Sequence, residues 1–423
     1  MSGTTFRRSI LAYTSMVVAA ATACSSDRIV GPTRIMDNQS DGRGVFQRYF
    51  AIGTSVSAGV QGDGLIAATQ ETSWPAQLAA AAGRTMNLPL IDGTGCKSPL
   101  AAPLMFGKRI SGEDAGADAS QLSCAPLQPG VTLPVDNVGL NGARTNDALY
   151  TTPGNISDQG NAKIYGRVLQ PGQTQVSTMM AANPKLVSVE LGANEVLEAR
   201  YGIAIEGGNL AAYDAWAPVY DKVLDSVQKV TKMAVVVGLI DKIGDAVAFR
   251  TGDELWQDHD NFLQHLYVDI QPDCQGSTNL VFIPFAVPIA AQYGAAYAAA
   301  KLPPFPFSCA GGKQGDVDFI LTTDEQKTVN DLMHRMTTHI QAEAARRGFA
   351  YFALGARYDR ADVKGQYSVL AQLGTPTPYG DYFSLDGLHP SALGQTVLRS
   401  RGRTRAQRHV QPGNSAAVRI RAT

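Results

Sequence analysis

The sequence predicts an α/β protein in which a parallel sheet of about five strands carries helices on both faces. Short apolar runs that end at or near glycine alternate with helical patterns along the chain, which is typical of parallel α/β folds. The run at 233–240 is apolar at nearly every position, as expected for a strand buried on both faces. The chain has 423 residues, 44% hydrophobic and 17% charged, so it can form a large core.

The predicted strands and helices follow one another in a regular order. The strands are expected at 48–52, 133–138, 185–191, 233–240 and 349–354. A helix is predicted over 74–82, with Ser73 as its N-cap and Pro75 in its first turn. The longest helical pattern covers 324–347 and stops before Gly348. The stretch 92–134, rich in Gly, Pro and Ser, is too long for a plain connection and is expected to be an ordered excursion.

Both ends of the chain are expected to lie outside a single domain at 45–398. Residues 1–24 place Arg7 and Arg8 before a short apolar stretch that ends in Ala21-Thr22-Ala23-Cys24. This pattern is typical of a bacterial lipoprotein signal in which Cys24 is acylated, and an ordinary signal peptide is the alternative. Residues 25–44 are predicted to be a flexible tether. We therefore expect an exported cell-envelope protein, held at the membrane by a lipid anchor and facing the periplasm or the outside.

The charge distribution separates the C-terminal tail from the rest of the chain. The formal net charge of −1 gives no indication of nucleic-acid binding. Residues 399–423 contain seven arginines and no acidic residue, and they are predicted to be a basic, disordered tail. Contact with anionic lipid or polysaccharide and a shifted reading frame are the alternative interpretations of this tail.

Four cysteines besides Cys24 suggest two disulfides, because an even number is typical of exported proteins. They are Cys96, Cys124, Cys274 and Cys309. Proximity favours pairing the first with the second and the third with the fourth, which closes loops of roughly 30 residues, each stabilised by about 3 kcal/mol. Two other pairings stay open. A zinc site is the rival interpretation, but no Cys-x-x-Cys pair is present, and no metal site is expected.

Polar residues that suit nucleophilic attack on an ester lie just after the predicted strands and near the C-terminus. Ser55 could be the nucleophile, with His389 as its base and Asp386 orienting the imidazole from three residues earlier. The Ser55 N–H, the Gly142 N–H and the Asn194 amide could stabilise an oxyanion. Ser57 is a rival nucleophile, although Ser55 fits the strand end better.

The order of these segments resembles the SGNH (GDSL-type) hydrolase family over about 49–397. Ser55, Gly142, Asn194 and the pair Asp386 and His389 match the four blocks of that family. The usual Gly-Asp-Ser-Leu is replaced by Gly53-Thr54-Ser55-Val56, and the usual Gly-x-Asn-Asp ends in Glu195. The resemblance implies a flavodoxin-like, three-layer α/β/α sandwich with about five parallel strands. It also implies cofactor-free ester hydrolysis through an acyl-enzyme on Ser55.

On this basis the expected function is hydrolysis of carboxylic esters of lipids or acylated carbohydrates. One alternative is a carbohydrate- or lipid-binding envelope lipoprotein that uses the same scaffold without turnover. Another is an acyltransferase that uses the same three residues. The sequence does not predict the acyl length, because the long segments at 92–134 and 241–320 would shape any pocket. It does not predict the oligomeric state either.

Overall fold

A computed structural model describes residues 43–313, 315–355 and 361–398. Its centre is a parallel sheet in the order β1-β2-β3-β9. These strands are β1 (Tyr49–Gly53), β2 (Leu186–Glu190), β3 (Ala234–Val237) and β9 (Ala350–Phe352). Four of the five predicted strands are therefore present, and the α/β class with a parallel sheet is confirmed.

The prediction of a regular strand is wrong for the segment 133–138. It runs beside β1 but makes a single parallel bridge, between Ala51 and Asn137. The Ala51 N–H donates to Asp136 O at 2.8 Å, and the Val138 N–H donates to Ala51 O at 3.0 Å. Pro134 has no N–H with which to extend a ladder. The sheet thus has four strands and one bridging segment at the β1 edge.

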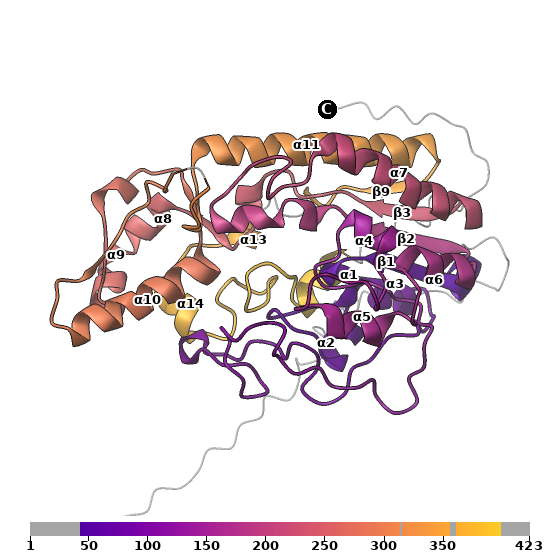
Figure 1. Cartoon of the computed structure of the whole chain (residues 1–423), viewed down its shortest axis with the longest axis horizontal. Helices are drawn as coiled ribbons and strands as arrows, with labels where there is room; N and C mark the ends of the chain where they lie inside the picture. The colour runs from indigo at the N-terminus through magenta and orange to yellow at the C-terminus, as the bar shows by residue number, and fades with distance from the viewer. Residues whose placement is uncertain (1–42, 314, 356–360, 399–423) are drawn as a thin grey trace, which may run out of the picture.

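Helices cover both faces of the sheet, because successive strand residues point to opposite sides. Phe50 and Ile52 pack with α6 (Gln175–Ala182), α7 (Tyr213–Val230) and α11 (Thr323–Arg346) on one face. Tyr49 and Ala51 pack with α3 (Trp74–Ala81) on the other. Figure 1 shows α11 and α7 along the upper side of the sheet. Both helices predicted from sequence are present, each within about one residue of its expected bounds.

A lobe beside the sheet has its own buried apolar cluster and lies at the left of Figure 1. Its strands are β4 (Phe249–Thr251), β5 (Val268–Ile270), β6 (Leu280–Phe282), β7 (Phe305–Phe307) and β8 (Ile320–Leu321). Its helices are α8 (Gly252–Gln257), α9 (His259–Asn261), α10 (Ile283–Ala299) and α14 (Val369–Gly374). The sequence did not predict this lobe, because strands of two or three residues leave no periodic pattern.

Short helices and turns occupy the connections. The α-helices are α1 (Ser55–Ala58), α2 (Ala67–Glu71), α4 (Thr145–Tyr150), α5 (Ala162–Val168) and α13 (Ala361–Lys364). The remaining turns are η1 (Arg43–Arg48), η2 (Leu104–Phe106), η3 (Ala193–Glu195), η4 (Leu197–Tyr201), η5 (Ile243–Asp245), η6 (Phe262–Leu266) and η7 (Pro272–Cys274). Because η1 begins at Arg43, ordered structure starts two residues inside the predicted tether.

The structure contains the disulfides Cys96–Cys124 and Cys274–Cys309, which are the pairs favoured by sequence proximity. Their sulfurs are therefore not free thiolates for zinc, and the two bridges are consistent with an extracytoplasmic protein. In the part of the chain that the structure describes, no helix is long and apolar enough to cross a membrane. The predicted signal at 1–24 with Cys24, most of the tether and the tail at 399–423 lie outside the described residues.

We predict that replacing Cys274 and Cys309 together by serine lowers the free energy of unfolding by about 2–4 kcal/mol, because the bridge restricts the unfolded chain. Urea unfolding under non-reducing conditions measures the loss. Peptide mapping without reduction checks the pairing directly. A peptide that joins Cys96 to Cys309, or an unchanged free energy of unfolding in the double variant, would contradict the prediction.

Candidate active site

Ser55 lies on a tight turn at the carboxyl end of β1. The strand ends at Gly53, Thr54 is the N-cap of α1, and Ser55 is the first residue of that helix. The helix lasts four residues and closes at Gly59, which has a φ of +88° and donates its N–H to Ser55 O. Glycine suits this left-handed position. The turn therefore places the hydroxyl at the edge of the sheet where ligands bind in parallel α/β folds.

His389 joins Ser55 to Asp386 in one chain of hydrogen bonds. Its Nε2 lies 2.8 Å from Ser55 Oγ, and its Nδ1 lies 2.7 Å from Asp386 Oδ2. The Asp386 carboxylate also accepts the N–H groups of Leu388 and His389 on its other oxygen, both at 2.9 Å. These bonds fold the segment 386–389 into a turn that presents the imidazole to Ser55. The structure thus brings together the three residues predicted to act in catalysis.

The charges of Asp386 and His389 stabilise each other in a buried setting. Burial alone would raise the pKa of Asp386, but the charge and hydrogen bonds of His389 outweigh it and hold that pKa well below its ordinary value. Burial alone would lower the pKa of His389, but Asp386 outweighs it and raises that pKa above the ordinary value of 6.5. The pair therefore favours a protonated imidazole, the form that a histidine base takes when it accepts a proton.

The Asp63 loop supports the carboxylate of Asp386 from outside the predicted segments. The Asp63 N–H donates to Asp386 Oδ2 at 2.5 Å. The Asp63 side chain pairs with Lys97 Nζ at 3.0 Å and with Arg109 Nη2 at 2.8 Å. Lys97 directly follows the disulfide cysteine Cys96. The excursion at 92–134 therefore helps to hold the site.

The predicted oxyanion donors lie on neighbouring loops. Gly142 has a φ of +72°, and a Cβ there would lie 2.7 Å from Asn161 Nδ2, so the position requires glycine. Asn194 donates through Nδ2 to Ala143 O at 2.7 Å, which ties the predicted amide to the Gly142 loop. Among the described residues, neither the Ser55 N–H nor the Gly142 N–H donates to a protein acceptor. Both backbone groups are thus unpaired within the part of the chain that the structure describes.

Several buried polar residues that hold the site were missed from the sequence. Gln175 donates to Gly53 O at 2.8 Å and to Val138 O at 2.7 Å, linking the end of β1 to its neighbouring segment. Glu195 accepts the Thr145 N–H at 2.6 Å at the start of α4. Glu190 bonds to the turn around Ser55. The one available signal in the sequence was the carboxylate of Glu190 at the end of a mostly apolar strand.

Ser57, the rival nucleophile, is fully buried, and its hydroxyl bonds to a carboxylate rather than to a histidine. Its hydroxyl donates to Glu190 Oε2 at 2.9 Å. The histidine contact belongs to Ser55 alone of the two serines. This arrangement favours Ser55 as the reactive hydroxyl.

The comparisons with known proteins found no matching family model, no matching curated protein and no matching solved structure. Within the described residues, no group of three or more His, Cys, Asp or Glu side chains could hold a metal ion.

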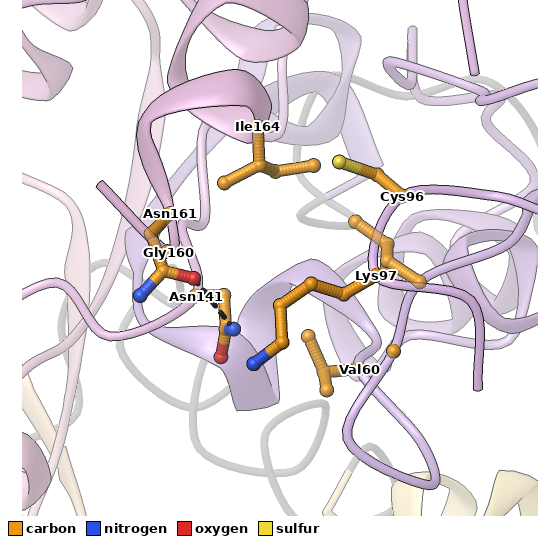
Figure 2. Close-up of a pocket in the computed structure, with 9 residues that line it drawn as sticks. Val60, Cys96, Lys97, Asn141, Gly160, Asn161 and Ile164 are labelled. Atoms are coloured by element: carbon orange, nitrogen blue, oxygen red, sulfur yellow. Dashed lines mark hydrogen bonds between the residues drawn. The ribbon is translucent and has the colours of Figure 1, made fainter. Parts of the chain in front are cut away.

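A small pocket borders the site and is shown in Figure 2. The space that it encloses is about 10 Å³, room for at most about one water molecule. Ser55, Asp386 and His389 are not among its lining residues, but two that are lie next to the site: the Val60 N–H donates to Ser55 O at 3.0 Å, and Asn141 precedes Gly142. Lys97, Asn141 and Asn161 supply polar groups to its wall, and Ile164 supplies apolar surface. The pocket thus offers little enclosed space beside the turn that carries Ser55.

We predict that Asp386→Asn lowers the pKa of His389 below 6.5, because it removes the charge that raises this pKa and leaves the opposing effect of burial. A titration of the histidine ring protons by NMR measures both values, and His389→Ala assigns the signal.

Asp260→Asn is the matched control, since Asp260 pairs with His259 at 3.3 Å and is not part of the site. It should leave the pKa of His389 unchanged. A His389 pKa at or below 6.5 in the wild-type protein would contradict the statement that Asp386 raises this pKa.

Proposed function

We propose that this protein is a serine ester hydrolase of the SGNH type, with Ser55 as nucleophile, His389 as general base and Asp386 as the residue that orients the base. The observation that carries the proposal is the hydrogen-bonded chain from Ser55 Oγ through His389 to Asp386, at 2.8 Å and 2.7 Å. A serine hydroxyl is weakly nucleophilic unless such a base removes its proton. The sheet order, with segment 136–138 beside β1, supports the flavodoxin-like arrangement of that family.

In the proposed acylation step, Ser55 Oγ attacks the ester carbonyl carbon while its proton passes to His389 Nε2. Asp386 stabilises the imidazolium that forms. The negative charge on the carbonyl oxygen is met by the N–H groups of Ser55 and Gly142 and by the amide of Asn194, and each such donor contributes about 10²–10³ in rate. The C–O bond to the alcohol then breaks, and the alcohol leaves with the proton from His389.

In the proposed deacylation step, water attacks the acyl-enzyme on Ser55. His389 accepts a proton from this water and returns it to Ser55 Oγ as the carboxylic acid leaves. The same donors stabilise the second oxyanion. Every proton that moves is thus carried by His389, which fits a site built around one histidine.

The pocket supports esters with short acyl groups over long-chain lipids. The space that it encloses is about 10 Å³, room for at most about one water molecule, which leaves no room for a long acyl chain. The polar groups of Lys97 and the two asparagines in its wall are poorly suited to a long hydrocarbon chain. Of the substrates expected from the sequence, acylated carbohydrates therefore fit better than lipid esters. Export to the cell envelope, with a lipid anchor at Cys24, remains part of the proposal.

We predict that Ser55→Ala and His389→Ala each lower kcat for p-nitrophenyl acetate by about 10⁴-fold or more, because removing either residue disables the shared proton transfer. Labelling of the purified protein by a fluorophosphonate probe should disappear in Ser55→Ala.

The control is His334→Ala, on the exposed side of α11, which should keep wild-type turnover. Probe attached to Ser57 in the Ser55→Ala protein, or wild-type protein that is folded but neither labelled nor active, would overturn the assignment. The second result would favour a binding lipoprotein.

We predict that p-nitrophenyl acetate and butyrate are hydrolysed at least about 10-fold more efficiently than palmitate, because the pocket leaves no room for a long acyl chain. Ile164→Ala should move the preference toward longer acyl chains by removing part of the pocket wall. The measurement is kcat/KM across a series of p-nitrophenyl esters. Ile205→Ala, which truncates an exposed side chain outside the pocket, is the control. A preference for palmitate in the wild-type protein would contradict the short-acyl interpretation.

A further inference from the structure

Glu190 is a buried acid at the carboxyl end of β2, directly beside the end of β1. It pairs in register with Gly53, and 6% of its surface is exposed. Among the described residues, no lysine, arginine or histidine forms an ion pair with it. Its partners come instead from the turn that carries Ser55. The proposed mechanism gives this carboxylate no task.

The carboxylate binds the residues on either side of the nucleophile. Oε2 of Glu190 accepts the Thr54 N–H at 3.0 Å, the Ser57 N–H at 3.2 Å and the Ser57 hydroxyl at 2.9 Å. The Thr54 hydroxyl lies 2.8 Å from Oε1 and 2.9 Å from Oε2. One oxygen atom therefore joins the residue before Ser55 to the residue two positions after it.

Packing leaves this turn little freedom to adopt another shape. A Cβ on Gly53 would lie 2.2 Å from Ser57 Oγ and 3.1 Å from Glu190 Oε2, so the three residues are in close contact. The helix α1 that follows has only four residues and cannot hold the turn by itself. Side-chain bonds therefore restrain the backbone around Ser55, and those to Glu190 act beside the bonds from Asn137 to Ser57 O at 2.8 Å and from Gln395 to Val56 O at 3.0 Å.

A purely structural role does not explain why an acidic residue occupies this position. A buried carboxylate without a cation is costly, and well-packed apolar residues usually stabilise a core as well or better. Burial raises the pKa of Glu190, and the bonds from Thr54 and Ser57 act against that rise. Because most of those bonds end on one oxygen, the residue can serve as their acceptor whether it is ionised or neutral.

We propose that Glu190 is a positioning residue for the nucleophile, holding Thr54 and Ser57 so that the Ser55 hydroxyl meets His389 and the Ser55 N–H meets the oxyanion. This inference rests on the proposed function and adds a residue to its machinery. It also accounts for Thr54, which occupies the position of the usual Asp and uses its hydroxyl to bond to Glu190.

The test compares Glu190→Ala with Glu190→Gln in the full chain. Glu190→Ala removes the acceptor, and we expect the rate of fluorophosphonate labelling and kcat per titrated site to fall about 10²-fold, the usual effect of a displacement near 1 Å. Glu190→Gln keeps an amide oxygen for the Thr54 and Ser57 donors, so both rates should recover to within about threefold of wild type. KM for p-nitrophenyl acetate should change little in either variant.

Glu254→Ala is the matched control. Glu254 accepts the Thr251 N–H at 2.8 Å and pairs with Arg250 at 3.0 Å in the lobe beside the sheet. It should lower the melting temperature without changing the labelling rate per titrated site. If Glu190→Ala does not fold, Thr54→Val combined with Ser57→Ala removes both hydroxyl donors and should slow labelling about 10-fold.

The outcomes separate this inference from the proposed function. If the wild-type protein is labelled and Glu190→Ala reacts at the wild-type rate per site, the role of Glu190 is overturned while the proposed function stands. If Glu190→Ala is unfolded, the double variant takes its place in this comparison. A Glu190→Gln protein as slow as Glu190→Ala also overturns it. A folded wild-type protein that is never labelled overturns the proposed function, and the inference with it.

Discussion

The parallel pairing of β1 with β2 is the constraint on which the rest of the site depends. Its register sets Gly53 opposite Glu190, so both strands end at the same edge of the sheet. Ser55 follows the first strand within two residues, and Asn194 follows the second within four. A slip of one residue would turn every side chain of a strand to the other face. The two apolar clusters that cover the sheet therefore fix the site as well as the core.

The sequence could predict the parts of this protein that have a period or a recognisable order. β1, β2, β3 and β9 show as apolar runs, and α11 shows its buried face at helical spacing. Ser55, Asp386 and His389 are identified by their order along the chain, although 334 positions separate the serine from the histidine. In each case the signal lies in a few adjacent residues, which is the range over which sequence patterns are informative.

The supporting residues could not be predicted, because their roles exist only in three dimensions. Asp63 reaches Asp386 through its backbone N–H, a group that every residue except proline has. Glu190 bonds to Thr54, and Gln175 bonds to Gly53, each across more than 100 positions in sequence. The lobe built from β4 to β8 is stabilised by a disulfide and by packing between very short elements. Such contacts leave no local trace in the sequence.

The long separation between Ser55 and His389 also bears on how the protein is made. A ribosome delivers the chain from its N-terminus, so Ser55 is synthesised early and His389 about 334 residues later. At the usual pace of about 5–20 residues per second, the interval is tens of seconds. During that time the serine has no base and is an ordinary hydroxyl. Under the proposed function, the nascent chain is therefore unreactive toward esters until the segment with His389 reaches Ser55.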